Sequence, residues 1–212
     1  IDFHVEDFVT RVNADIVGKV VNIASRCAGF IEKGFDGWLS ADLPDPALIQ
    51  KFSDQHEVIC GYFENREYSR AIREIMALAD IANQYINNVK PWVIAKDEGR
   101  TDELQAVCTQ GLNLFRMLVT WLAPVVPQLA DRSAEFLRHP IATGSALNEL
   151  TKPLIDHQIG PFTRLLDRIA VADADAMMEN TQLMNQNDRS NTPGGHLDDD
   201  PISPQISIDE FA

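Results

Sequence analysis

Apolar residues recur every three or four positions over the first 27 residues, and this spacing constrains the fold more than any other feature. It predicts an amphipathic helix from Val5 to Cys27, because a half-buried strand would alternate with a period of two. The glycines and prolines within 29–46 then predict a break in regular structure. Polar residues at matching spacing share the opposite face of this first helix: Arg11, Asp15, Lys19, Asn22 and Arg26.

The same period predicts further helices beyond that break, and no part of the body alternates like a strand. Pro91 ends the first of them, since proline lacks an N–H donor and disfavours helical geometry in the residue before it. The first 172 residues are therefore predicted to form an all-α helix bundle. The expected helices cover 54–87, with an interruption near 64–67, then 101–122, 128–137 and 161–169.

Charge is unevenly distributed along the chain, and it limits the classes of partner. There are 18 Lys and Arg residues against 32 Asp and Glu residues, a formal net charge of -14. Residues 1–172 hold 17 basic and 23 acidic residues, whereas 173–212 hold one basic and 9 acidic residues. This balance disfavours a wholly basic nucleic-acid-binding protein and non-specific binding to a membrane surface. We expect 173–205 to be an acidic, flexible linker and 206–212 to begin a further, truncated module.

The cysteine content and the lack of long apolar stretches indicate the cellular compartment in which the protein works. Three scattered cysteines, an odd number, fit a reducing compartment better than a disulfide framework. No stretch approaches the roughly 18 apolar residues that a membrane span needs. We therefore expect a cytoplasmic protein without a membrane partner. Ile1 is not a natural start, so the chain is expected to be a fragment of a longer one.

No catalytic motif is present in the sequence. There is no glycine-rich phosphate loop, no nucleophile elbow and no metalloprotease motif. His56 and Cys60 stand four positions apart and could share a metal, but two ligands do not complete a tetrahedral site. The plainer interpretation of this pair is a surface histidine beside a buried cysteine. A small helical metalloenzyme is the weaker alternative. We predict neither a catalytic residue nor a metal ligand.

Two pairs of residues have the chemistry of recognition. Asn22 and Arg26 are neighbours on the polar face of the first helix, an amide beside a planar guanidinium. Pro91 and Trp92 follow the end of the next long helix, where an indole offers a flat face worth about 1–3 kcal/mol per stacked base. An ordinary solvated pair and an indole that plugs the bundle are the plainer alternatives.

Further polar residues line one shoulder of the helix that leads to Trp92. Asp80, Asn83 and Asn87 have poor helix propensity, which favours a role beyond forming the helix. Amides, a fixed cation and a stacking face suit the reading of splayed single-stranded RNA bases. Such a local reader needs no basic surface over the whole chain if other parts of the molecule hold the backbone.

Several segments resemble the anticodon-binding domain of bacterial methionyl-tRNA synthetases. The segments DFVTRVNADIV at 7–17 and VVNIASR at 20–26 resemble its first helix. The segments REIMALADIANQY from Arg73 and PWVIAK from Pro91 resemble later parts, as do NLFR from Asn113 and GPF from Gly160. The matches keep their order and span roughly 5–170. Asn-x3-Arg followed by a PWxxAK box makes the resemblance specific.

This resemblance implies a helix bundle of the class I aminoacyl-tRNA synthetase type that recognises the CAU anticodon of methionine tRNA. Asn22 and Arg26 would lie in the anticodon site. Pro91 would shape the loop of Trp92, which would stack on or beside the first anticodon base. The resemblance also puts three residues close to this site: Asp80, Asn83 and Arg168. Asn87 departs from the aspartate usual in the family and is not assigned.

The resemblance further implies that the parent protein is an enzyme, a methionine-tRNA ligase, and that this chain alone is not catalytic. The family's nucleotide-binding motifs and zinc-bearing insert have no counterpart here, so ATP, magnesium and zinc would belong to a catalytic domain outside this chain. The expected partners are the tRNA anticodon loop and that catalytic domain. Residues 206–212 resemble the approach to a C-terminal tRNA-binding module through which some family members dimerise. The alternative is a helical protein-protein interaction module.

Overall fold

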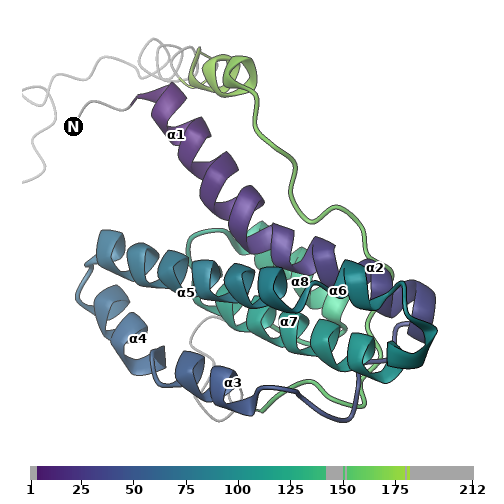
Figure 1. The fold of residues 1–212 in the computed structure, drawn as a ribbon. Helices are drawn as coiled ribbons and strands as arrows, with labels where there is room; N and C mark the ends of the chain where they lie inside the picture. Colours follow the sequence, from purple (N-terminus) through teal and green to yellow (C-terminus); the bar gives the residue numbers. More distant parts are fainter. Residues whose placement is uncertain (1–3, 142–149, 151, 180, 182–212) are drawn as a thin grey trace, which may run out of the picture. The chain divides into compact units, whose positions relative to one another are not determined.

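The computed structural model describes residues 4–141, 150, 152–179 and 181 (Figure 1). Regular structure in these residues is helical, apart from one isolated β-bridge between Trp38 and Gln158. The prediction of an all-α fold is therefore confirmed. The chain divides into two compact units, one formed by Thr10–Arg168 and the other by the flanking residues.

The helices alternate with short connections throughout the described part. Segment η1 has wide π-type turns and continues directly from α1 into α2, whereas η2 is a single 3-10 turn. Residues 171–179 are also helical. In order, the elements are α1 (Val5–Arg11), η1 (Val12–Val21), α2 (Asn22–Phe35), α3 (Pro46–Ser53), α4 (His56–Glu64), α5 (Tyr68–Val89), α6 (Pro91–Ile94), η2 (Glu98–Arg100), α7 (Thr101–Leu122) and α8 (Pro127–Leu137).

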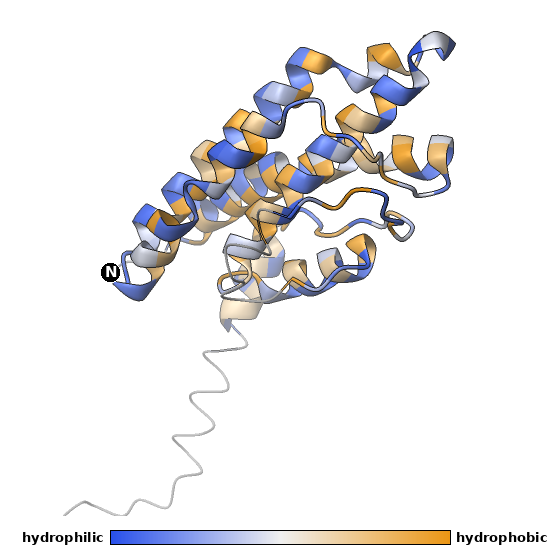
Figure 2. Cartoon of the chain, turned by 90° about the horizontal axis from the view of Figure 1, so that it is seen from below, coloured by the Kyte–Doolittle hydropathy of each residue, from blue (hydrophilic) through white to orange (hydrophobic). Residues whose placement is uncertain are grey.

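Helix α7 forms the centre of the bundle. Its residues are buried without a break from Val107 to its end, and its most extensive contacts are with α2 and α5. Hydrophobic residues form stripes along the helices of the bundle in Figure 2, as burial against a central helix requires. Close approach of the three helices depends on Gly111, where a Cβ atom would lie 2.6 Å from Cys27 Sγ and 2.9 Å from Ile86 Cδ1.

The first helix is longer than its sequence predicts. It passes Gly29 and Gly34 and ends only at Phe35, because the apolar stripe continues through Ile31, which is fully buried. The backbone then turns at Asp36 and Gly37, whose φ angles are 48° and 80°. A Cβ atom on Gly37 would lie 2.9 Å from the carbonyl oxygen of Ile159, so this position requires glycine.

Two other predictions of local structure need correction. Helix α3 lies between the break expected at 29–46 and the helix expected from 54, where no helix was predicted; Asp45 accepts a hydrogen bond from the Leu48 N–H at 3.0 Å and Pro46 occupies the first helical position. The helix predicted at 161–169 is wrong, since the chain there is irregular. Phe162 packs edge-on against Phe136 with ring centroids 5.1 Å apart, so tertiary packing buries what looked like a helical stripe.

The other expected helices are present. The interruption predicted near 64–67 separates α4 from α5, and the predicted 101–122 and 128–137 correspond to α7 and α8. The helical residues 171–179 overlap the start of the expected linker at 173–205. Apart from Thr181, the rest of that linker and the expected module start at 206–212 lie outside the described residues.

Candidate functional site

A tight backbone turn presents Trp92 at the end of α5. Lys90 adopts a left-handed conformation with φ 51°, and its N–H bonds the Ile86 carbonyl at 3.0 Å, which closes α5. Pro91 cannot continue α5 and instead begins the one-turn helix α6. Pro91 and Ile94 are buried and fill the end of the bundle, whereas Trp92 is 37% exposed. The indole is therefore held at the surface by a turn that is anchored on both sides.

The Arg26 guanidinium lies over the ring of Trp92. Its central carbon is 4.8 Å from the ring centroid, which is within the range of a cation-π contact. Among the described residues, Arg26 has no ion pair and no hydrogen bond, so its N–H donors remain available. A cation thus occupies one face of the indole. The sequence predicted a flat stacking face but not this contact.

Asn22 begins α2 one helical turn before Arg26 and is oriented by α5. Its side-chain N–H donates to Asn83 Oδ1 at 3.4 Å. The amide of Asn83 is itself fully engaged, because its Nδ2 donates to the carbonyls of Lys19 at 3.1 Å and Ala79 at 2.9 Å. Asn83 therefore positions Asn22, whose Oδ1 is left as an acceptor without a partner among the described residues.

Asp80 is engaged in an ion pair with the first helix. Its carboxylate lies 3.0 Å from Lys19 Nζ, and Asp15 lies 3.5 Å from the same nitrogen. The hydrogen bond with Asp80 raises the pKa of Lys19 above its ordinary value, although burial acts in the opposite direction. Lys19 thereby offsets much of the negative charge that Asp80 would otherwise present to an RNA phosphate.

Arg168 lies on the other side of α2, in a groove of about 630 Å³ that Asn22 also lines. Gly18 and Ser25 form part of its wall, and Arg164 lines it while paired with Asp167 at 2.7 Å. Arg168 has no ion pair among the described residues. Gly18 was missed from the sequence, yet a glycine inside a helix is a usable signal because it costs about 1 kcal/mol relative to alanine.

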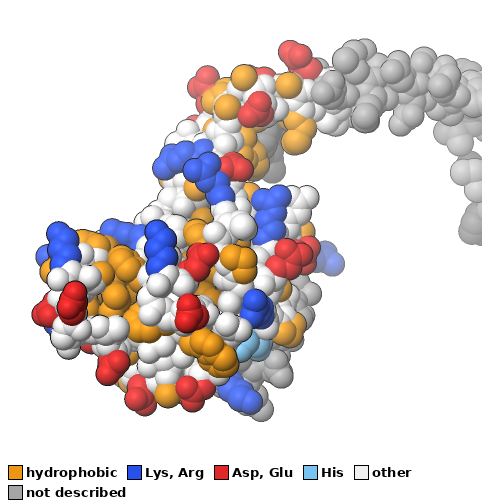
Figure 3. Space-filling view, turned by 90° about the vertical axis from the view of Figure 1, so that its right-hand side faces the viewer, with side chains coloured by type: hydrophobic (Ala, Val, Ile, Leu, Met, Phe, Trp, Pro, Cys, Tyr) orange, Lys and Arg blue, Asp and Glu red, His pale blue; other side chains and the backbone are white. Residues whose placement is uncertain are grey.

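Six of the seven expected site residues lie around Asn22 and Arg26 in the first turns of α2. Arg26 lies over Trp92, the residue after Pro91, whereas Asn22 bonds Asn83 and shares a groove with Arg168. Asp80 belongs to the ion pair one helical turn before Asn83. On the face shown in Figure 3, Lys and Arg are interspersed with Asp and Glu, so no single-sign field covers it. Such a surface suits recognition by individual side chains rather than by bulk charge.

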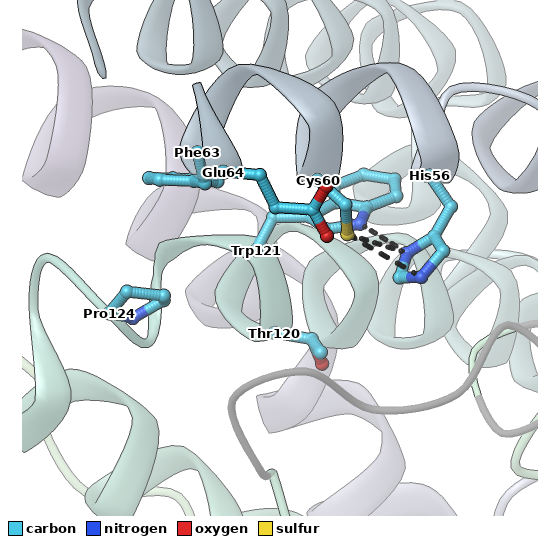
Figure 4. Close-up of a pocket in the computed structure, with 7 residues that line it drawn as sticks. All are labelled: His56, Cys60, Phe63, Glu64, Thr120, Trp121 and Pro124. Carbon is cyan, nitrogen blue, oxygen red and sulfur yellow. Dashed lines mark hydrogen bonds between the residues drawn. The ribbon is translucent and has the colours of Figure 1, made fainter. Parts of the chain in front are cut away.

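The pair His56 and Cys60 lies in a separate pocket of about 180 Å³ beside Trp121 (Figure 4). Trp121 Nε1–H donates to His56 Nδ1 at 3.0 Å, and Cys60 Sγ lies 3.6 Å from His56 Nε2. Burial lowers the pKa of His56 and raises that of Cys60, so both groups are neutral at pH 7. Over the described ranges, no group of three or more His, Cys, Asp or Glu residues could hold a metal ion.

Comparison with known proteins gives the family. The model of the anticodon binding domain of methionyl tRNA ligase matches residues 41–155, just over half of the chain. This chain belongs to that family. The matched range of the methionyl-tRNA ligase domain contains Asp80, Asn83, Pro91 and Trp92, and the remaining expected site residues lie outside it.

Solved structures share the fold of this anticodon-binding domain. The apo form of Mycobacterium tuberculosis methionyl-tRNA synthetase matches with a TM-score of 0.70 and 22% identity, over 79% of this chain and 35% of that one. The same enzyme with methionyl-adenylate matches with a TM-score of 0.66 and 23% identity, over 77% and 33%. This chain therefore spans about a third of their length. In the part of the chain that the structure describes, no helix is long and apolar enough to cross a membrane.

Proposed function

We propose that this domain recognises the CAU anticodon of methionine tRNA, as part of a methionyl-tRNA ligase. The observation that carries the proposal is the Arg26–Trp92 contact at 4.8 Å, one helical turn from Asn22. It combines an aromatic surface, unused guanidinium donors and an amide oxygen in one place. These are the groups that read unstacked bases in single-stranded RNA.

The first anticodon base, a cytosine, would stack on the Trp92 indole in place of the Arg26 guanidinium, which would move from the ring face to the edge of the base. Its exocyclic amine is a donor that the free Asn22 Oδ1 can accept, and its ring N3 and O2 are acceptors that the Arg26 guanidinium can bond. Asn83 would act as a positioning residue, because all its donors are already used. Arg168 would contribute positive charge from the groove on the other side of Asn22.

A uracil in the same place would present the wrong hydrogen-bonding groups to Asn22 and Arg26. Its O4 is an acceptor facing the Asn22 oxygen, and its N3–H is a donor facing the guanidinium. Both mismatches leave polar groups without partners in a partly dehydrated site, which costs about 1–3 kcal/mol for a wrong base. We therefore expect a preference of about tenfold or more for cytosine at the first anticodon position.

The activity of the parent enzyme lies outside this chain in our proposal. The parent would join methionine to its tRNA with ATP and magnesium, and the anticodon contact would orient the acceptor end toward a separate catalytic domain. We also propose that any zinc site lies in that catalytic domain, that any dimer contact lies outside this chain, and that the protein is cytoplasmic. Its support is the family membership of the domain and the absence of a catalytic motif from the sequence.

The test is a titration with a methionine anticodon stem-loop and with the same hairpin carrying uracil as the first anticodon base. We expect the cytosine hairpin to bind more tightly and to quench tryptophan fluorescence. Equal affinity for both hairpins would refute the proposal.

Two tryptophan variants assign the signal. Trp92→Phe should weaken binding of the cytosine hairpin and abolish most of the quenching. Trp38→Phe is the matched control, because Trp38 is also an exposed tryptophan, at 49%, pairs with Gln158 and is none of the expected site residues. If both variants behave alike, the quenching does not report the proposed site.

A further inference from the structure

A second groove, of about 1100 Å³, runs along α5 toward its N-terminal end. Its walls come from three segments of the unit 10–168: the first helix with Arg11 and Lys19, helix α5 with Tyr68 and Arg73, and the connection after α7 with Val125. We call it the arginine groove. None of the expected anticodon residues lines it except Asp80.

Its charges favour an anionic occupant. Lys19 forms ion pairs with Asp15 at 3.5 Å and with Asp80 at 3.0 Å, so these three side chains together carry one negative charge. Arg11 and Arg73 are exposed, and neither forms an ion pair or a hydrogen bond with another described residue. The groove lining thus carries three positive and two negative charges, a net charge of +1, and its two guanidinium groups are unpaired among the described residues, on a chain whose net charge is -14. Guanidinium groups bind phosphate oxygens through paired N–H donors.

The apolar side chains of the groove are also unusually accessible. Tyr68 is 56% exposed and contacts Phe63 with ring centroids 6.3 Å apart, so its ring is held in place at the rim. Val125 is 48% exposed on the opposite wall. An exposed aromatic ring between cations suits the sugar and base faces of a nucleic acid strand.

The arginine groove extends along α5 as far as Asp80, about one helical turn before Asn83 of the proposed anticodon site. The Lys19–Asp80 pair lines the groove, and Lys19 also supplies the carbonyl that Asn83 bonds. Asp80 and Asn83 are three residues apart on α5, which is about 4.5 Å along the helix axis. From Asp80 to the end of α5 at Val89 is about 14 Å by the same measure. A strand that leaves the Trp92 site along α5 would therefore reach the groove after about 14 Å, roughly two to three nucleotides.

We infer that the arginine groove binds the sugar-phosphate backbone of the RNA whose anticodon lies at Trp92. The identity of that RNA rests on the proposed function, whereas the groove's preference for a polyanion rests on Arg11 and Arg73. Contacts of this kind add affinity that does not depend on base sequence.

The test uses the double variant Arg11→Gln/Arg73→Gln with the two anticodon hairpins at several salt concentrations. We expect affinity for both hairpins to fall by the same factor, about tenfold at low salt, so that their ratio is unchanged. Loss of two phosphate contacts should reduce the slope of log affinity against log salt by about 1.4 to 1.8. Circular dichroism and thermal melting verify that the variant is folded.

The matched control is Lys33→Gln/Lys51→Gln. It removes the same two positive charges from exposed positions on α2 and α3 that do not line the groove. The control should change affinity less than twofold and leave the salt slope unchanged. Equal effects of the two double variants would overturn the inference, because net charge alone would then explain the loss.

The outcomes also separate this inference from the proposed function. If the groove variant weakens both hairpins but wild-type protein does not distinguish them, the groove binds RNA and the anticodon proposal fails. If wild-type protein distinguishes the hairpins and the groove variant binds them normally, the anticodon proposal stands and the groove inference is refuted. A protein would then be the better candidate for its occupant.

Discussion

Replacing Gly111 with alanine should destabilise the domain at the helix junction behind the candidate site. The added Cβ would lie 2.6 Å from Cys27 Sγ and 2.9 Å from Ile86 Cδ1, whereas unstrained contacts lie at about 3.5–4.0 Å. The Ile86 methyl group can rotate away, but Cys27 is fully buried and its sulfur lies one bond from the rigid part of its side chain. Helix α2 must therefore move away from α7.

The size of this effect follows from two opposing contributions. Overpacking of a dense core costs about 1–3 kcal/mol, and two short contacts place Gly111→Ala near the upper value. Alanine in a helix recovers about 0.5–1 kcal/mol relative to glycine. The net loss is about 2 kcal/mol, which corresponds to a Tm decrease of about 4–8 °C for a chain of this size.

Gly29→Ala is the control, measured with Gly111→Ala by thermal and urea denaturation. Gly29 also lies inside a helix, but no atom lies within 4 Å of the position of its added Cβ, so this variant should be slightly stabilised. Cys27→Ala in the Gly111→Ala background should recover part of the loss, because it removes the closest atom. A Gly111→Ala protein as stable as the Gly29→Ala protein would refute the reasoning.

Three further predictions concern the site and its surroundings. Arg26→Lys should weaken cytosine-hairpin binding by about tenfold in a fluorescence titration, because an ammonium lacks the planar fork of the guanidinium. Asn83→Ala should lower the free energy of urea unfolding by about 1–3 kcal/mol and weaken the discrimination between hairpins, since Asn22 loses its partner. Burial lowers the pKa of His56, so the unfolded chain takes up this proton first and stability should fall as pH drops below about 6.5. Urea titrations at pH 5 and 7 should show this fall, and it should be smaller in His56→Gln.

Sequence periodicity predicted most helices because most are buried on one face, and even α7, which is buried on all sides from Val107 onward, keeps its apolar residues at helical spacing. The stripes of α5 and α7 are complete in the sequence, and the break between α4 and α5 was visible in its residues. The helix predicted at 161–169 was wrong because burial there does not follow one face of a single element. Its apolar residues are buried through separate contacts such as Phe162 on Phe136, and contacts of this kind can mimic helical spacing.

The sequence singled out candidate site residues, but it did not show which of their polar groups are already engaged within the fold. Asn83 looked like a reader of bases, yet its amide donors are spent on the carbonyls of Lys19 and Ala79. Asp80 looked equally available, yet it is paired with Lys19. Lys19 lies about 60 residues away on another helix, and local spacing carries no information about it.

What the sequence determined by itself was the set of helices and the chemical kinds of side chain on their polar faces, because both depend on neighbours within a few turns. Only the tertiary structure decided which of those side chains meet. The Arg26 guanidinium lies on the Trp92 indole because α2 and α5 pack on the same central helix, with Gly111 allowing their close approach. Contacts between residues 66 positions apart follow from such packing and from no local pattern.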